Sequence, residues 1–154
     1  MGFFKMEKLK CFLMVGIPAS GKSSYSRQLA STSNAKIIST DLIREKIYGD
    51  ASYQGNWSEI ENELYKLMKK YLKKNISFII DATNTKKEYR ESLLKFSDSI
   101  DWVCYWLDTD LQECKERNLE RFRTVSNDVI DRMYAQLKKT PPRVSEGFSR
   151  VFKI

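Results

Sequence analysis

The amino-acid sequence predicts an α/β fold in which five parallel strands form a sheet with helices on both faces. Two observations predict this fold. Short apolar runs alternate with longer amphipathic stretches from one end of the chain to the other, and no repeat or low-complexity linker interrupts them. Strand, helix and strand in succession favour parallel pairing, because the connecting helix packs back onto the sheet. The length of 154 residues fits one domain covering 1–154.

The N-terminal third predicts two strands, each followed by a helix. Residues 10–15 (KCFLMV) form an apolar run of strand length, and the segment 22–31 reads as the helix behind it. Residues 35–40 (AKIIST) predict the second strand. The residues from 41 to about 48 predict the next helix.

The middle of the chain predicts a turn-rich segment, a long helix and a third strand. The segment 49–56 (GDASYQGN) leads into a helix expected over 58–74, and residues 77–81 (SFIID) form the strand. Thr85 and Glu88 have the S/T-x-x-E spacing of a capping box, which predicts a helix from there to about residue 96.

The last third predicts a fourth strand, two helices and a final strand. The strand is expected at 102–108 (WVCYWLD) and the helices at 111–122 and 127–139. Prolines at 141 and 142 end the second helix, because proline cannot continue the hydrogen-bond ladder. The tail 148–154 (FSRVFKI) suits a strand.

Composition restricts the chemistry. The chain has no histidine, which excludes histidine-dependent triads and metal sites and leaves carboxylates as proton acceptors. Cys11, Cys104 and Cys114 are expected to be buried residues, because an odd count without C-x-x-C favours neither disulfides nor a zinc site. A net charge of +7 favours polyanionic partners. Without a signal peptide or an apolar run long enough to span a membrane, a cytoplasmic location is expected.

A glycine-rich loop after the first strand predicts a nucleotide site. Residues 16–23 (GIPASGKS) match G-x-x-x-x-G-K-[ST] between a strand and a helix, the context of a P-loop. Backbone N–H groups and the helix N-terminus favour phosphate, Lys22 reaches the β- and γ-phosphates, and the Ser23 hydroxyl ligates Mg²⁺. The sequence thus indicates a three-layer P-loop NTPase fold. The expected nucleotide-binding residues are Gly16, Ala19, Ser20, Gly21, Lys22, Ser23 and Ser24.

Polar residues follow the second and third strands, where ligands of parallel sheets bind. Asp41 has two interpretations, a helix cap or a general base facing the loop, and Arg44 one turn later could clamp an anionic acceptor. Asp81 could hold Mg²⁺, and Ala82 after it leaves no acidic pair to activate water. Asn84 is either a cap of the next helix or a substrate contact.

A basic helix follows the fourth strand. Arg117 and Arg121 lie four residues apart, with Arg123 just beyond, so two guanidinium groups on one helix face could close over a triphosphate. The alternative is a solvated helix in which glutamates pair with these arginines at i,i+3 and i,i+4 spacing.

Taken together, these residues resemble the P-loop kinase family of the bacteriophage polynucleotide 5′-kinase, to which zeta-toxin-like and AAA-type small kinases are related. The resemblance runs from GIPASGKSS through STDLIRE and IIDATNT to RNLERF and VSNDVIDRMYAQL. It implies ATP with Mg²⁺, Asp41 as the base and Arg44 as a contact of the acceptor's phosphate. It also implies that Arg117 and Arg121 are lid arginines that hold the nucleotide and the transferring phosphoryl group. Asp81 and Asn84 match the family's third-strand motif.

The sequence departs from the family in two ways. The phage enzyme continues into a phosphatase domain beyond the kinase unit, so no end-healing phosphatase activity is expected of this sequence. The segment 49–75 has no motif that matches a nucleic-acid track, which leaves the acceptor open. Trp57, Tyr53 and Tyr65 in that segment are candidates for stacking on bases, although Tyr65 falls at a helical spacing typical of core residues.

Three functions follow, in order of preference. The first is phosphoryl transfer from ATP to the 5′-hydroxyl of DNA or RNA. The second is transfer to a small molecule, such as a sugar, a nucleoside, an amino-sugar precursor or an antibiotic. The third is a nucleotide-binding ATPase that transfers nothing, against which the missing N-K-x-D signature and Ala82 argue. The sequence leaves the oligomeric state open.

Overall fold

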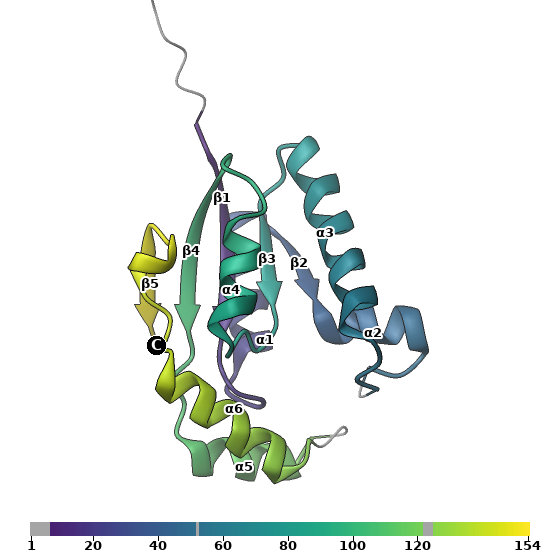
Figure 1. Cartoon of the computed structure of the whole chain (residues 1–154), viewed down its shortest axis with the longest axis vertical. Coiled ribbons are helices and arrows are strands. Elements are labelled where there is room, and N and C mark those ends of the chain that lie inside the picture. The colour runs from purple at the N-terminus through teal and green to yellow at the C-terminus, as the bar shows by residue number, and fades with distance from the viewer. Residues whose placement is uncertain (1–6, 52, 122–124) are drawn as a thin grey trace, which may run out of the picture.

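A parallel five-stranded sheet forms the centre of the computed structural model, which describes residues 7–51, 53–121 and 125–154 (Figure 1). The strands stand in the order β2-β3-β1-β4-β5, and every neighbouring pair is parallel. The fold class predicted from the sequence is therefore confirmed. The strands are β1 (Leu9–Val15), β2 (Lys36–Ser39), β3 (Phe78–Asp81), β4 (Ile100–Trp106) and β5 (Arg150–Lys153).

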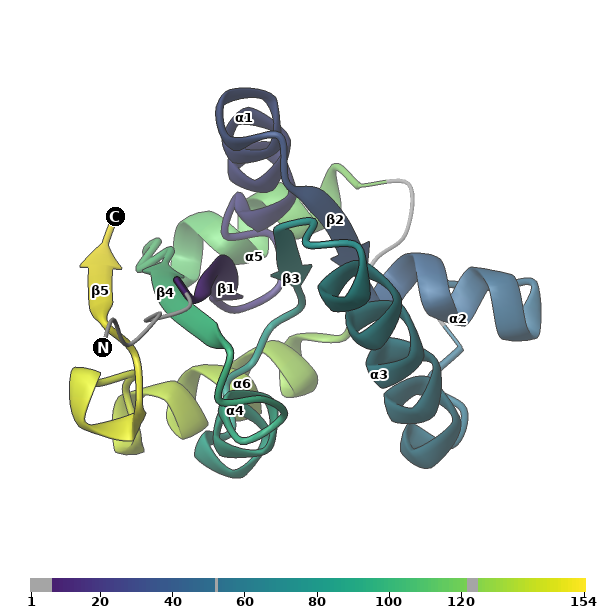
Figure 2. The ribbon, with the colours of Figure 1, turned by 90° about the horizontal axis from the view of Figure 1, so that it is seen from above.

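Helices cover both faces of the sheet and its carboxyl edge. One face carries α1 (Lys22–Ser33), and the other carries α3 (Trp57–Lys73) and α4 (Lys87–Leu94), as Figure 2 shows. At the carboxyl ends of the strands lie α2 (Thr40–Tyr48), α5 (Leu111–Leu119) and α6 (Asn127–Lys139); in Figure 1, α5 and α6 are below the sheet and α2 is at its lower right. A short 3₁₀ helix, η1 (Val144–Glu146), leads into β5.

The core has two layers because the side chains of β1 alternate between the faces. Cys11 and Leu13 belong to the larger cluster, which also contains the buried side chains of α3. Phe12 and Met14 belong to a smaller cluster against α1. All three cysteines are buried and free, as the sequence predicts. Burial raises the pKa of the Cys11 and Cys104 thiols to about 12, so neither is a thiolate near neutral pH.

Several predicted element boundaries differ from those of the structure, among them the fourth strand and the start of α4. The fourth strand ends at Trp106 and not at 108. The capping box at Thr85 and Glu88 does not form: α4 begins at Lys87, and its N-cap, Lys86, makes no side-chain cap bond. The Thr85 hydroxyl instead donates to the Gln136 side chain of α6 (2.7 Å), so a tertiary contact outcompetes the local one.

A buried arginine ties the loop after β3 to the C-terminal segment. Arg90 on α4 is fully buried, and its guanidinium donates two hydrogen bonds to the Glu146 carboxylate (2.9 and 2.7 Å). The same group donates to the carbonyls of Asn84 (3.0 Å), Thr85 (3.3 Å) and Thr140 (2.7 Å). Every N–H of Arg90 thus has an acceptor, which a buried guanidinium requires.

Within the described ranges, no helix combines the length and the apolar character that a membrane span needs.

Candidate active site

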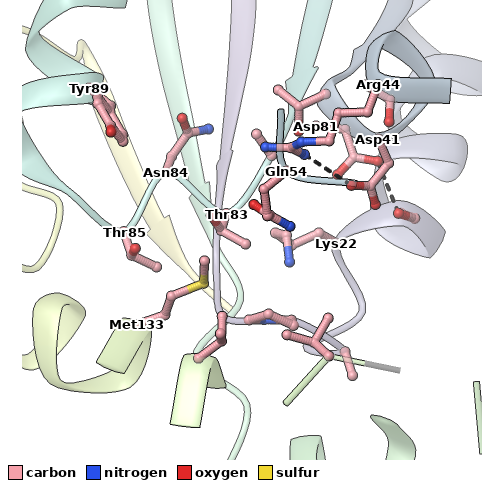
Figure 3. Close-up of a pocket in the computed structure, with 18 of the residues that line it drawn as sticks. Lys22, Asp41, Arg44, Gln54, Asp81, Thr83, Asn84, Thr85, Tyr89 and Met133 are labelled. Carbon is pink, nitrogen blue, oxygen red and sulfur yellow. Dashed lines mark hydrogen bonds and ion pairs between the residues drawn. The ribbon is translucent and has the colours of Figure 1, made fainter. Parts of the chain in front are cut away.

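A cavity of about 920 Å³ opens at the carboxyl edge of the sheet. Its lining comes from the loop between β1 and α1, the start of α2, the loop before α3, the end of β3 and the loop after it, and helices α4, α5 and α6. Figure 3 shows Lys22, Asp41 and Asp81 on one side and Asn84, Tyr89 and Met133 on the other. The edge on which sequence reasoning placed the site is the edge that carries this cavity.

The glycine-rich loop has the backbone of a phosphate cradle. Gly21 has φ +100°, a conformation that favours glycine, and Ala19 has φ +64°. A Cβ on Gly16 would lie 2.5 Å from the Ser20 hydroxyl oxygen and 3.1 Å from the Leu107 carbonyl, so only glycine fits there. Ala19, Gly21, Lys22, Ser23 and Ser24 line the cavity, whereas Gly16 and Ser20 lie behind it in the body of the loop.

The side chain of Lys22 folds back onto the phosphate loop. Its ammonium group donates to the carbonyl of Ile17 (2.9 Å), and only 8% of the residue is exposed. Burial lowers the pKa of Lys22 to about 8, against the opposing influence of the Asp81 and Asp41 carboxylates. An anion that bound in this loop would have to compete with the Ile17 carbonyl for this ammonium.

Ser23 and Asp81 form the expected oxygen pair for Mg²⁺. The Ser23 hydroxyl donates to the Asp81 carboxylate (3.0 Å), and Asp81 is 9% exposed. Burial raises the pKa of Asp81, while Lys22 and the Ser23 hydrogen bond oppose this. The described residues contain no group of three or more His, Cys, Asp or Glu that could enclose a metal. The pair still fits Mg²⁺, which takes one or two protein oxygens together with phosphate and water.

Asp41 lies in the first turn of α2 and does not cap it. The cap is Ser39, whose side chain accepts from the backbone N–H of Leu42. Asp41 is half-exposed in the cavity and pairs with Arg44 (3.3 Å), whose side chain is only 15% exposed. The Nε of Arg44 is buried and has no hydrogen-bond partner among the described residues. Ser39 and not Asp41 therefore caps α2, while Asp41 lies in the first turn, where the helix dipole favours its negative charge as the sequence suggested.

Asn84 joins the two sides of the site. Its side-chain amide donates to the carbonyl of Met14 (2.7 Å), just before the phosphate loop, and its backbone has φ +48°. Beside it, the Gly16 N–H donates to the Thr83 carbonyl (3.0 Å). Asn84 does not cap α4, which removes that interpretation. It lines the cavity while it fixes the loop after β3 to the base of the phosphate loop.

Arg117 and Arg121 both reach the cavity, but not from one helix face. Helix α5 ends at Leu119, short of the predicted 122, because the buried Asn118 turns the chain back. Its amide donates to the Val125 carbonyl (2.7 Å) and accepts from the Val125 N–H (3.0 Å). Arg117 pairs with Glu113 (2.6 Å), the i,i+4 contact that the sequence offered as an alternative. Phe122 and Arg123 lie outside the described residues.

Several residues that line the cavity were not predicted from the sequence. Gln54 and Gly55 come from the turn-rich segment, where Gly55 (φ +60°) packs so closely on Tyr48 that a Cβ would overlap its ring. Helix α6 contributes one face, for which the i,i+3,i+4 spacing was a usable signal. Its lining residues are Val129, Arg132, Met133 and Gln136, and α4 with its N-cap adds Tyr89 and Lys86.

The three aromatic candidates of the segment 49–75 differ in role. Tyr65 stacks on Phe96 (5.4 Å between ring centroids, 2° between planes), which confirms that it is a core residue. Tyr53 packs edge-on against Tyr48. Trp57 lines the cavity and stacks on Tyr89 (5.0 Å, 30°).

Comparison with known proteins identifies a family and a relative that match most of the chain. The sequence model of the AAA domain family matches residues 12–140. A curated L-seryl-tRNA(Sec) kinase of Methanococcus maripaludis is 30% identical over 134 residues, which cover 79% of this chain and 50% of the relative. The chain thus spans about half the length of that relative.

Two solved structures share the fold. One chain of a Pnkp1/Rnl/Hen1 RNA repair complex superimposes with a TM-score of 0.80 at 21% identity, covering 89% of this chain and 46% of that one. A gluconokinase from Sinorhizobium meliloti 1021 superimposes with a TM-score of 0.63 at 17% identity, covering 97% and 83%. At these identities the likeness concerns the fold alone.

Proposed function

The chain belongs to the AAA domain family of P-loop kinases, and on that premise we propose that it transfers the γ-phosphoryl group of ATP to the 5′-hydroxyl of a nucleic-acid strand. The observation that carries the proposal is the position of Asp41. This carboxylate has no capping role, is half-exposed in the cavity and lies close enough to Lys22 and Asp81 to influence their pKa values.

The donor side of the site is the phosphate loop. Lys22 and the N–H groups around Gly21 would hold the β- and γ-phosphates, and Ser23 and Asp81 would hold Mg²⁺. When bound, Mg²⁺ neutralises charge on the phosphates. Arg117 and Arg121 would close over the triphosphate from α5 and the segment after it, where both line the cavity.

On the acceptor side, Asp41 would accept the proton of the attacking hydroxyl. The hydroxyl oxygen forms a bond to the γ-phosphorus, the bond between that phosphorus and the bridging oxygen breaks, and ADP leaves. Positioning contributes most of the rate in this chemistry, because the transition state is loose. Arg44, ion-paired to Asp41 and with an unpartnered Nε, would bind the acceptor's phosphate.

The choice of a nucleic-acid acceptor rests on the cationic wall of the cavity and on the relatives. Arg44, Lys86 and Arg132 line the cavity and add positive charge to it, which suits a phosphate-bearing strand better than a neutral sugar. One similar structure comes from an RNA repair complex, and the curated relative is named for a tRNA substrate. A small-molecule acceptor is the second candidate, because a similar fold occurs in a gluconokinase.

The base assignment is tested by Asp41→Asn. We expect transfer to fall by about 10²–10⁴-fold, because general-base catalysis contributes that much, while ATP affinity stays within a few-fold of the wild type. Asp98→Asn, at an exposed position outside the cavity, is the matched control and should leave transfer unchanged. Transfer by the Asp41 variant at a near wild-type rate would remove the base role.

The acceptor is tested by following the label of γ-labelled ATP. We expect it on 5′-hydroxyl oligonucleotides of DNA or RNA. Label on a member of a sugar and nucleoside panel, with none on oligonucleotides, would establish the second candidate. Label released only as free phosphate would contradict transfer altogether.

A further inference from the structure

The outer face of α3 carries a row of four exposed lysines. At 3.6 residues per turn, Lys66, Lys69, Lys70 and Lys73 fall within about 100° of the helix circumference. That arc lies opposite the buried side chains Ile60, Leu64 and Met68, which face the core. We call these four residues the lysine row.

No carboxylate of the described chain forms an ion pair with any member of the lysine row. The three glutamates of α3 have other partners. Glu59 accepts from the Tyr48 hydroxyl (2.8 Å), Glu61 from the Trp57 indole (2.9 Å) and Glu63 from the Lys46 ammonium (2.9 Å).

Compensation of the helix dipole does not account for the row. Cations near the last turn of a helix are stabilising, and Lys70 and Lys73 lie there. Lys66 and Lys69 lie further back, beyond the reach of that effect. The dipole therefore accounts for two of the four charges, while Lys66 interacts electrostatically with Glu63 one turn earlier on the helix.

The helix links the row to the cavity. Trp57, the first residue of α3, lines the cavity, and the helix runs from there toward the opposite end of the sheet (Figure 1). Lys66 lies about 14 Å and Lys73 about 24 Å along the axis from Trp57, at 1.5 Å per residue. A stacked strand rises 3.4 Å per nucleotide, so these distances correspond to about four and about seven nucleotides.

We propose that the lysine row binds the phosphate backbone of a nucleic-acid strand whose 5′ end lies in the cavity. This inference rests on the proposed function, because the proposed function places the 5′ end of the strand in the cavity. A membrane surface fits the row less well, because the apolar side chains of α3 are buried in the core or packed against it, and none of them is fully exposed beside the lysines.

The test is the triple variant Lys66→Gln/Lys70→Gln/Lys73→Gln, compared with the wild type on 5′-hydroxyl oligonucleotides of 2, 4, 8 and 16 nucleotides. We expect an unchanged KM for the dinucleotide and a raised KM for the 8-mer and 16-mer. Three lost contacts to a single strand lower the slope of log affinity against log salt by about 2. Between 50 and 200 mM salt, the variant should therefore lose about 20-fold less affinity for the 16-mer than the wild type does.

The matched control is Lys36→Gln/Lys138→Gln/Lys139→Gln, which removes the same charge from exposed lysines elsewhere. It should leave every KM unchanged. A raised KM for the 16-mer in the control and not in the lysine-row variant would place the strand away from α3 and overturn the proposal. An equal rise in KM for the dinucleotide and the 16-mer would also overturn it.

Direct binding separates this proposal from the proposed function. Fluorescence anisotropy with a labelled 16-mer measures affinity without transfer, and the lysine-row variant should bind more weakly even if no oligonucleotide is phosphorylated. Equal 16-mer affinity in the variant and the wild type would refute the lysine row as a strand site. Binding of phosphatidylserine vesicles that depends on the row, without binding of the 16-mer, would identify a membrane surface instead and refute the proposal.

Discussion

Removal of the buried Arg90 guanidinium should destabilise the protein strongly. In Arg90→Met the Glu146 carboxylate, whose side chain is 3% exposed, stays buried without its cation. The carbonyls of Asn84, Thr85 and Thr140 lose their donor as well. Breaking a buried ion pair by removing one partner costs about 3–5 kcal/mol. At about 2–4 °C per kcal/mol for a chain of this size, the melting temperature should fall by about 6–20 °C.

The double variant Arg90→Met/Glu146→Leu separates the cost of the unpaired Glu146 carboxylate from the other costs of losing Arg90. Replacing both partners removes the uncompensated carboxylate, so the double variant should be more stable than Arg90→Met alone. Lys87→Met is the control on the same helix. Its pair with Glu91 spans 3.7 Å between side chains that are 47% and 39% exposed. Surface pairs of this kind contribute about 0–1 kcal/mol.

The assay is urea unfolding followed by tryptophan fluorescence, which reports the free energy of unfolding and its midpoint. An Arg90→Met variant within 1 kcal/mol of the wild type would refute the reasoning. A double variant no more stable than the single one would also refute it, because the buried charge would then not be the dominant cost.

Two further predictions concern the nucleotide side of the site. Because burial lowers the pKa of Lys22 to about 8 and a bound triphosphate favours the charged ammonium, ATP binding should take up a proton above pH 8 and none at pH 6.5. Titration calorimetry in two buffers of different ionisation enthalpy measures this, and zero uptake at pH 9 would contradict it. Asn118→Ala should raise the KM for ATP and leave the acceptor KM unchanged, because the turn that positions Arg121 loses both bonds to Val125. Steady-state kinetics at saturating levels of the other substrate test this, and an unchanged KM for ATP would show that Arg121 does not depend on the turn.

The sequence predicted those parts of the site that depend on local rules. Lys22, Asp41 and Asp81 follow three strands, and parallel strands deliver such residues to one edge of the sheet. Arg44 followed from its distance of three residues from Asp41. These inferences needed only the order of strands and helices.

The parts that failed depend on contacts between segments far apart in the sequence. Thr85 has the spacing of a capping residue, but Gln136, 51 positions later, takes its hydroxyl. The end of α5 depends on Asn118 and its two hydrogen bonds to Val125. Helix propensity does not predict these bonds. Gln54 enters the cavity because its loop packs on Tyr48, a tertiary contact with no sequence motif.

The place of β1 in the middle of the sheet has a consequence for folding. This strand pairs only with β3 and β4, whose residues begin at 78 and 100. At about 5–20 residues per second, a ribosome needs several seconds after making β1 before it has made either partner. During that time the five apolar residues of Cys11–Val15 have no strand to pair with, so the nascent chain presents a segment that chaperones would recognise. Formation of β3 ends this exposure and, through the Gly16 and Asn84 contacts, completes the base of the phosphate loop in the same step.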